Sequence, residues 1–239
     1  MTPPEVRLQK FLSERGVTSR RGAVDLLASG RITVNGSIIR EPGTRINPAS
    51  DTVLLDGNPL SAQPPRKRTI LLYKPAGYVC TAARNEGPTV YDLIPDIPER
   101  LIPVGRLDRE SEGLLLMTND GELALRLTHP RYGHSKTYEV TVVGDVTDEI
   151  LTTLQSRIEL DGYTIQPVDV RLKRRLPRRH VMLEFTLHEG RNRQIRNMCR
   201  YVKIHVESIV RVLLGPLTIG KLTPGQWRDV KPRELAQAR

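Results

Sequence analysis

Two stretches of alternating residues set the fold class of this 239-residue chain. In residues 136–143, Tyr138, Val140 and Val142 fall on one face of an extended strand, and residues 180–187 alternate in the same way. A period of two places one face of a strand in a core. Such strands follow one another with few helices between them. The pattern therefore predicts an α+β fold built on a largely antiparallel sheet.

A short basic segment divides the chain. Residues 63–68 contain two adjacent prolines followed by Arg66, Lys67 and Arg68. The prolines prevent a helix and the charges favour solvent. We expect a small domain over residues 1–62, a linker over residues 63–68 and a larger domain over residues 69–239. A flexible linker also predicts that the small domain moves relative to the larger one.

The small domain has clear local signals. Leu8, Phe11 and Leu12 have helical spacing, and Ser19 is positioned to cap a second helix. Asn-Gly at positions 35–36 lies between β-branched residues, which predicts a hairpin with a type I′ turn. The basic residues on or beside the two helices are candidate phosphate contacts: Arg7, Lys10, Arg20 and Arg21.

The charge distribution points to a polyanionic partner. The chain has 37 basic and 27 acidic residues, a net charge of +10, and 29 of the basic residues are Arg. Residues 1–68 have a net charge of +5 and residues 171–211 of +9, whereas residues 69–170 have −7. The planar guanidinium group suits phosphate, so nucleic acid is the favoured partner. Aromatic residues are only 4% of the chain, which disfavours a base-stacking platform.

Other features set limits on location and cofactors. The two cysteines, Cys80 and Cys199, form no disulfide framework, and with five scattered histidines they show no metal-ligand spacing. No run of 18 apolar residues and no apolar signal segment is visible. We expect a cytoplasmic protein without a membrane span and without a metal site. Because no long apolar interface pattern is visible, we also expect a monomer.

The segment over residues 104–121 carries the most chemical information. A polar loop, Gly105-Arg106-Leu107-Asp108-Arg109-Glu110, enters an apolar strand that closes in Asn119-Asp120-Gly121. Polar groups on a loop held by a rigid strand are typical of functional sites. From composition alone, an ordinary solvated loop is an equal alternative.

Several motifs in order carry a resemblance to a known family. The Gly-Arg-Leu-Asp sequence at 105–108 and the Thr-Asn-Asp-Gly at 118–121 resemble the catalytic motif of the RsuA-type ribosomal RNA pseudouridine synthases. Further similar segments are residues 74–79, 127–138, 188–198 and 215–225. Residues 7–36 resemble the S-four-type RNA-binding domain that precedes the catalytic domain in this family.

The resemblance implies a cofactor-free isomerisation of uridine in ribosomal RNA. It makes Asp108 the nucleophile, Tyr138 the active-site tyrosine that stacks on the base, and Arg196 the cation beside the nucleophile. Arg106 is the candidate to fill the space left by the flipped base, since a target base must leave its stack to be reached. Arg191 and Arg193 are expected to contact the RNA backbone and Lys136 to orient the pocket.

The form of the motif at residues 190–194, Gly-Arg-Asn-Arg-Gln, is more similar to the large-subunit (23S) enzymes than to the small-subunit (16S) ones. Two other classes stay open. One is a non-catalytic RNA-binding factor in ribosome assembly, and the other is a metal-dependent nuclease that uses Asp108, Glu110 and Glu112. One departure from the family pattern is that residues 201–205 lack an expected glycine, which leaves that turn undetermined.

Overall fold

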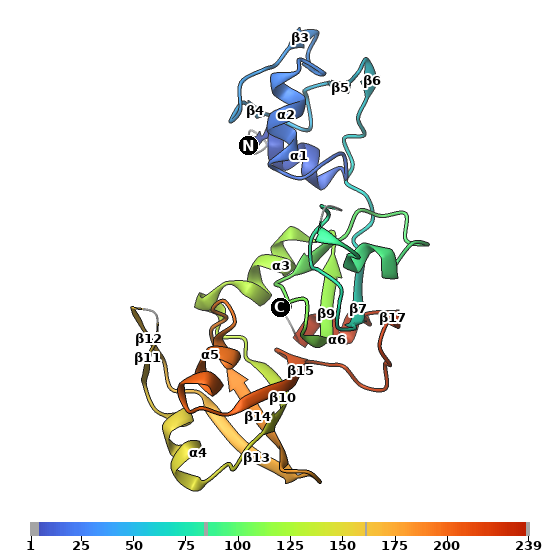
Figure 1. The fold of residues 1–239 in the computed structure, drawn as a ribbon. Helices are drawn as coiled ribbons and strands as arrows, with labels where there is room; N and C mark the ends of the chain where they lie inside the picture. Colours follow the sequence, from blue (N-terminus) through green and yellow to red (C-terminus); the bar gives the residue numbers. More distant parts are fainter. Residues whose placement is uncertain (1–4, 84–85, 161, 238–239) are drawn as a thin grey trace. The chain divides into compact units, whose positions relative to one another are not determined.

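The computed structural model describes residues 5–83, 86–160 and 162–237. The chain divides into two compact units, each described by itself below (Figure 1). Unit 1 comprises Met1–Arg68 with Asn119–Gly121, and unit 2 comprises Thr69–Thr118 with Glu122–Arg239. None of the helices in the described ranges is long and apolar enough to cross a membrane.

Unit 1 packs two short helices against small sheets. The helices are α1 (Leu8–Glu14) and α2 (Gly22–Ala28). A four-stranded sheet has the order β3-β2-β5-β6, and a second pair joins β1 to β4. The strands are β1 (Val6–Arg7), β2 (Ile32–Val34), β3 (Ser37–Ile38), β4 (Arg45–Ile46), β5 (Val53–Leu55) and β6 (Asn58–Pro59). The predicted helical stripe of Leu8, Phe11 and Leu12 lies buried in this unit's core.

The local predictions for unit 1 are confirmed. Asn35 and Gly36 both have positive φ, 49° and 82°, as a type I′ turn requires. The Ser19 hydroxyl accepts a hydrogen bond from the Gly22 N–H at 2.9 Å and so caps α2. The end of the predicted linker is not wholly solvated, because the Asn119 side chain hydrogen-bonds the backbone of Arg66 and Arg68.

Unit 2 is built on one large sheet with the order β13-β14-β10-β15-β9-β7-β17, to which β8 and β16 add at β9 and β15. β9 runs parallel to β15, and the other pairings described are antiparallel, as the sequence predicts. The strands are β7 (Thr69–Lys74), β8 (Ile102–Val104), β9 (Glu112–Thr118), β10 (Lys136–Val143), β13 (Asp169–Arg175), β14 (His180–Leu187), β15 (His205–Leu214), β16 (Leu217–Thr218) and β17 (Trp227–Asp229).

Helices cover both ends of this sheet. They are α3 (Gly121–Thr128), α4 (Asp148–Gln155), α5 (Gln194–Tyr201) and α6 (Pro232–Gln237), with short 3-10 turns η2 (Val90–Leu93) and η3 (Pro130–Tyr132). A separate hairpin joins β11 (Ile158–Leu160) to β12 (Tyr163–Ile165). Figure 1 shows α4 and α5 beside the β10, β13 and β14 end, whereas α3 and α6 lie near β7 and β9.

Burial on one or both faces explains the apolar patterns of β9 and β14. In β9, Leu114 and Leu116 belong to one hydrophobic cluster, whereas Leu115 and Met117 belong to another on the opposite face. A strand covered on both faces is apolar throughout. In contrast, β14 buries Val181, Leu183, Phe185 and Leu187 in a single cluster and leaves the intervening residues partly exposed, which confirms the predicted alternation.

Helix α5 begins after a residue with a left-handed backbone and ends in the segment that lacks the expected glycine. Arg193 has a left-handed backbone (φ 49°), so the helix begins only at Gln194. At the other end Lys203 is also left-handed, with φ 59°. The Lys203 N–H bonds the Arg200 carbonyl at 3.0 Å and the Ile204 N–H bonds the Cys199 carbonyl at 3.0 Å. This is a Schellman cap, with lysine in the position that glycine normally takes.

Candidate active site

A cavity of about 500 Å³ in unit 2 brings together the residues that the motifs singled out. It is formed by the loop before β9, the start of β10, the segment leading into α5 and the middle of β15. All seven candidates from this unit line it: Arg106, Asp108, Lys136, Tyr138, Arg191, Arg193 and Arg196. The sequence therefore identified residues that are up to 90 positions apart in the chain and share one cavity.

The candidates in the small unit lie elsewhere. Arg7, Lys10 and Arg20 line a separate hollow of about 390 Å³ in unit 1, together with Arg45, which the sequence analysis did not single out. Arg21 does not line it. This arrangement gathers basic groups on unit 1 as an RNA-binding surface requires.

A buried lysine holds the loop that carries Asp108 through hydrogen bonds to its backbone. Lys74, at the end of β7, is fully buried. Its Nζ donates to the carbonyl oxygens of Ser111 at 2.7 Å, Asp108 at 3.0 Å, Pro75 at 3.1 Å and Arg109 at 3.3 Å. Burial lowers the pKa of the Lys74 ammonium, while its contacts with carbonyl oxygens keep the donors satisfied. Residues 74–79 were noted only for their similarity to the family, so this role of Lys74 was missed.

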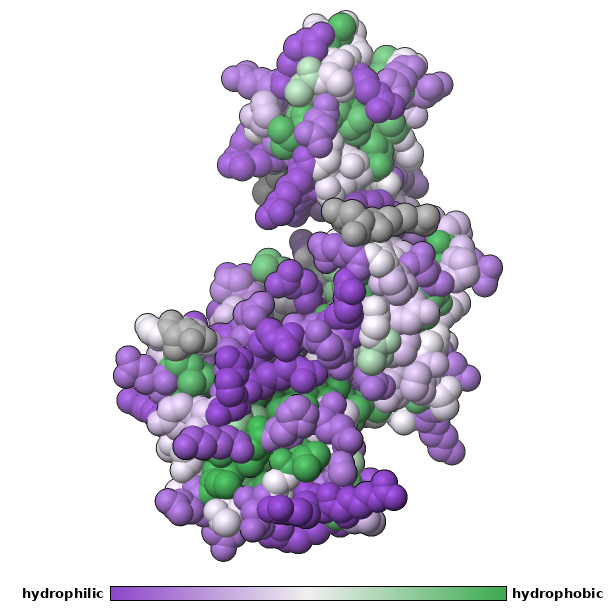
Figure 2. Space-filling model, in the orientation of Figure 1, coloured by the Kyte–Doolittle hydropathy of each residue, from purple (hydrophilic) through white to green (hydrophobic). Residues whose placement is uncertain are grey.

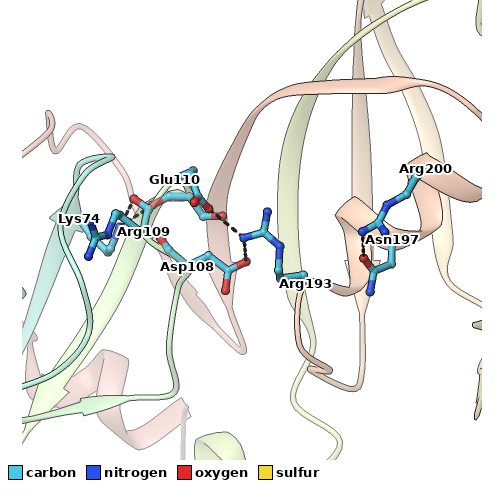
Figure 3. Close-up of polar contacts among 8 residues, drawn as sticks. Lys74, Asp108, Arg109, Glu110, Arg193, Asn197 and Arg200 are labelled. Carbon is cyan, nitrogen blue, oxygen red and sulfur yellow. Dashed lines mark hydrogen bonds and ion pairs between the residues drawn. The ribbon is translucent and has the colours of Figure 1, made fainter. Parts of the chain in front are cut away.

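The Asp108 carboxylate faces a cation, but not the predicted one. Arg193 Nη1 lies 4.0 Å from Asp108 Oδ2 and 3.0 Å from Glu110 Oε2 (Figure 3). The hydrogen bond from Arg193 lowers the pKa of Glu110. Arg193 reaches both carboxylates because its left-handed backbone places it ahead of α5. The Asp108 side chain is 35% exposed, so a ligand in the cavity can reach it.

Arg196 lines the cavity without such a pair. Arg196 is the third residue of α5, and among the described residues the cation within 4.0 Å of the Asp108 carboxylate is Arg193, not Arg196 as expected. Its Nε and one of its Nη atoms are buried and have no hydrogen-bond partner within the described chain. Buried donors without partners are rare in folded proteins. Arg196 therefore offers unused hydrogen-bond donors to a ligand.

Tyr138 stands in the middle of the sheet. It pairs with Phe185 of β14 and with Arg211 of β15, next to an irregularity in the β10–β15 register. Its half-buried ring packs against two hydrophobic clusters while also lining the cavity. Its hydroxyl makes no hydrogen bond with the described residues, so the core role and a stacking role for this ring are compatible.

Arg211 is a site residue that the sequence analysis missed. It is 2% exposed, lines the cavity and donates from Nε to the Leu114 carbonyl at 2.8 Å. One of its Nη atoms is buried without a partner in the described chain. Its charge also lowers the pKa of Lys136, after the larger effect of burial. An arginine inside the apolar strand 209–214 was the available signal, because charged residues are rarely buried without a purpose.

The charges of the cavity select an anionic ligand. Asp108 is the one acidic residue among the described residues that line it. Six cations line it as well: Arg106, Lys136, Arg191, Arg193, Arg196 and Arg211. Such an excess of positive charge attracts the phosphates of RNA.

The nuclease alternative finds no support in the arrangement of acidic residues. Glu112 is the first residue of β9, and Asp108 and Glu110 lie on the preceding loop, so the three do not share a strand face. Glu110 is engaged with Arg193. Over residues 5–83, 86–160 and 162–237, no three His, Cys, Asp or Glu side chains cluster as metal ligands would.

Comparison with known proteins identifies the class. The RNA pseudouridylate synthase family matches residues 68–201, and the S4 domain matches residues 6–53. An uncharacterized RNA pseudouridine synthase of Aquifex aeolicus is 44% identical over 98% of this chain and 93% of that protein. Ribosomal large subunit pseudouridine synthase B of Bacillus subtilis is 36% identical over 98% of this chain and 95% of that protein.

A solved structure agrees with this assignment. The crystal structure of a pseudouridylate synthase covers 98% of this chain with a TM-score of 0.69 and 26% identity. The chain therefore belongs to the RNA pseudouridylate synthase family, and it is an enzyme that forms pseudouridine in RNA. Within that family it is of the RsuA type, with an S4 domain ahead of the catalytic domain.

Proposed function

We propose that this enzyme converts one uridine of 23S ribosomal RNA to pseudouridine, with Asp108 as the nucleophile. The observation that carries the proposal is a partly exposed carboxylate, Asp108, on a loop held by Lys74, in a cavity whose other charged lining residues are all cations. The names of the relatives in Bacillus subtilis and Pseudomonas aeruginosa support the large ribosomal subunit as the target. The two domains of the proposal are residues 1–62 and 69–239, joined by residues 63–68.

The reaction needs no external oxidant or reductant. The glycosidic bond between ribose C1′ and uracil N1 breaks, the uracil turns, and a bond from C1′ to uracil C5 forms. The proton on C5 leaves and N1 gains one, so atoms and charge balance without a cofactor. A carboxylate can form a covalent intermediate in such a reaction and thereby divide one difficult step into two.

The other residues follow from this scheme. Tyr138 stacks on the flipped uracil and lies in reach for proton transfer at the ring. Arg193 lies beside Asp108 before RNA enters, and Arg196 replaces or joins it when the unused donors of Arg196 meet the substrate. Arg106 fills the space of the extruded base, whose removal costs a few kcal/mol. Lys136 orients the pocket and Arg191 contacts the backbone.

The small unit supplies affinity. Arg7, Lys10 and Arg20 share a basic hollow, and with Arg21 they bind phosphates of the RNA away from the target base. We expect the enzyme to act as a monomer in the cytoplasm, without metal. A non-catalytic assembly factor would not need Asp108, Tyr138 and Arg196 to converge on one cavity.

The proposal is tested by mapping pseudouridine in ribosomal RNA. Carbodiimide-stop primer extension is carried out on RNA from cells with and without the gene. Loss of a single stop in 23S RNA is expected, and it would also name the nucleotide. Loss of a stop in 16S RNA would move the target to the small subunit, and an unchanged map would favour the assembly factor.

A further inference from the structure

A second basic groove adjoins the catalytic cavity in unit 2. It has a volume of about 400 Å³ and is lined by the outer face of α5 and the start of β15. Its polar lining consists of Arg193, Arg196, Arg200, Lys203 and His205, and no Asp or Glu lines it. Arg193 and Arg196 also line the catalytic cavity, so the two hollows are neighbours that share these two side chains. Figure 2 shows strongly hydrophilic side chains gathered over this part of the unit.

Arg193, at the edge shared with the catalytic cavity, pairs with Glu110, whereas Arg200 and Lys203 form no ion pair with the residues that the structure describes. Arg200 donates to the Asn197 side chain at 2.6 Å, which is uncharged (Figure 3). Neither Lys203 nor Arg196 makes an ion pair with any residue that the structure describes. Like charges brought together in this way repel one another, unless an anion binds between them.

Lys203 gives the strongest sign that the charge serves a ligand. It occupies the left-handed position of the Schellman cap, where a side chain is disfavoured and glycine is usual. The cap itself is complete without a side chain at this position, because its hydrogen bonds use the backbone and both Ile204 and Cys199 are buried in one hydrophobic cluster. A lysine kept in a strained position, exposed and lining a groove, points to a use for its ammonium group.

We propose that this groove binds the phosphodiester backbone of the RNA strand next to the target uridine, with Lys203 and Arg200 as phosphate contacts. The inference rests on the proposed function, because it needs an RNA strand that enters the catalytic cavity. Phosphate rather than base is the recognised group, because the groove is lined by cations and by no Phe, Tyr or Trp. The contacts position the strand and carry no sequence information.

The test compares Lys203→Gly with two other variants. Glycine keeps the left-handed cap and removes the side chain, so the unfolding midpoint should equal or exceed that of the wild type. RNA affinity should fall nonetheless. We expect Kd and KM for transcribed 23S RNA to rise about three- to tenfold at 0.15 M salt, and the salt slope of log Kd to drop by about 0.7–0.9. At saturating RNA, kcat should be unchanged.

The controls separate charge from structure. Lys203→Arg keeps a cation and should restore wild-type Kd. Lys221→Ala removes the same charge from an exposed position outside both hollows and should change neither Kd nor slope. Equal Kd and slope for Lys203→Gly and the wild type would overturn the inference, and so would a weaker Kd with an unchanged slope or a loss of kcat alone.

The wild-type protein distinguishes this inference from the proposed function. If the wild type forms no pseudouridine in 23S RNA, the proposed function fails, whatever the variants do. If it is active and Lys203→Gly binds RNA as well as the wild type, only the groove assignment fails.

Discussion

Replacing Lys74 by Met tests whether the buried ammonium group holds the loop of Asp108. The methionine side chain has similar length and is apolar, so it fills the space but donates no hydrogen bond. Four carbonyl oxygens lose a donor. Those of Asp108 and Arg109 also accept backbone hydrogen bonds from Ser111 and Gly77, so the main losses fall on Pro75 and Ser111.

The magnitude follows from those two carbonyls. Leaving a buried acceptor unsatisfied costs about 1–3 kcal/mol, so two cost about 2–6 kcal/mol. Part of this loss is offset, because methionine has no charge to desolvate. We expect the free energy of unfolding to fall by about 2–4 kcal/mol, with a midpoint lower by roughly 10 °C. Because the loop carries Asp108, the proposed nucleophile, kcat should fall more than KM rises.

The assay uses the single tryptophan of the chain. Trp227 lies in β17, which pairs with the strand that ends in Lys74, so its fluorescence reports unfolding of unit 2. Lys221→Met is the matched control, since Lys221 is exposed, and it should melt with the wild type. A Lys74→Met protein that melts within 2 °C of the wild type and keeps its kcat would refute the reasoning.

Three other predictions follow from individual residues. Gly113→Ala places a Cβ 2.3 Å from the Arg211 carbonyl oxygen at a φ of 102°, so we expect the free energy of unfolding to fall by more than about 4 kcal/mol, or no soluble protein to form. Gly121→Ala is the control in the same thermal melt and should be neutral, because the space around Gly121 is open. Burial raises the pKa of the Cys199 thiol to about 12. A disulfide reagent at pH 8 should therefore react with one thiol, Cys80, in the native protein and with two in denaturant. Rapid reaction of two thiols in the native protein would contradict the buried position of Cys199. The hydrogen bond from Arg228 lowers the pKa of Glu234 to about 2. The wild type should therefore be more stable than Glu234→Gln above pH 4.5, and this difference should disappear as the pH falls to about 2. Equal melting midpoints of the two proteins at pH 6 would show that the Arg228–Glu234 pair adds no stability.

The sequence predicted the elements whose signals are local. The Asn35-Gly36 hairpin, the stripe of α1 and the alternation of β14 each depend on residues within one turn or one strand, and the structure has all three. The motif residues of the catalytic cavity were also identified from the sequence. The resemblance to the family connects segments that are far apart in the chain, which composition alone cannot do.

The missed features depend on contacts between distant segments. The bond from Lys74 to the Ser111 carbonyl spans 37 residues, and the bond from Arg211 to the Leu114 carbonyl spans 97. A lysine that ends a strand looks solvent-exposed in sequence, and only the fold shows that carbonyl oxygens surround it. Arg193 was expected to contact the RNA backbone, whereas in the structure its guanidinium group lies beside Asp108 and Glu110, which are more than 80 residues away in the chain.

The most direct test of the central claim uses Asp108→Asn. Transcribed 23S RNA labelled with tritium at uracil C5 releases the label only when C5 becomes bonded to ribose. The variant should lower the rate of release by at least about 10³-fold while binding RNA with nearly the wild-type Kd, because affinity depends on the basic side chains. Tritium release by Asp108→Asn at a rate near that of the wild type would contradict the assignment of Asp108 as the nucleophile.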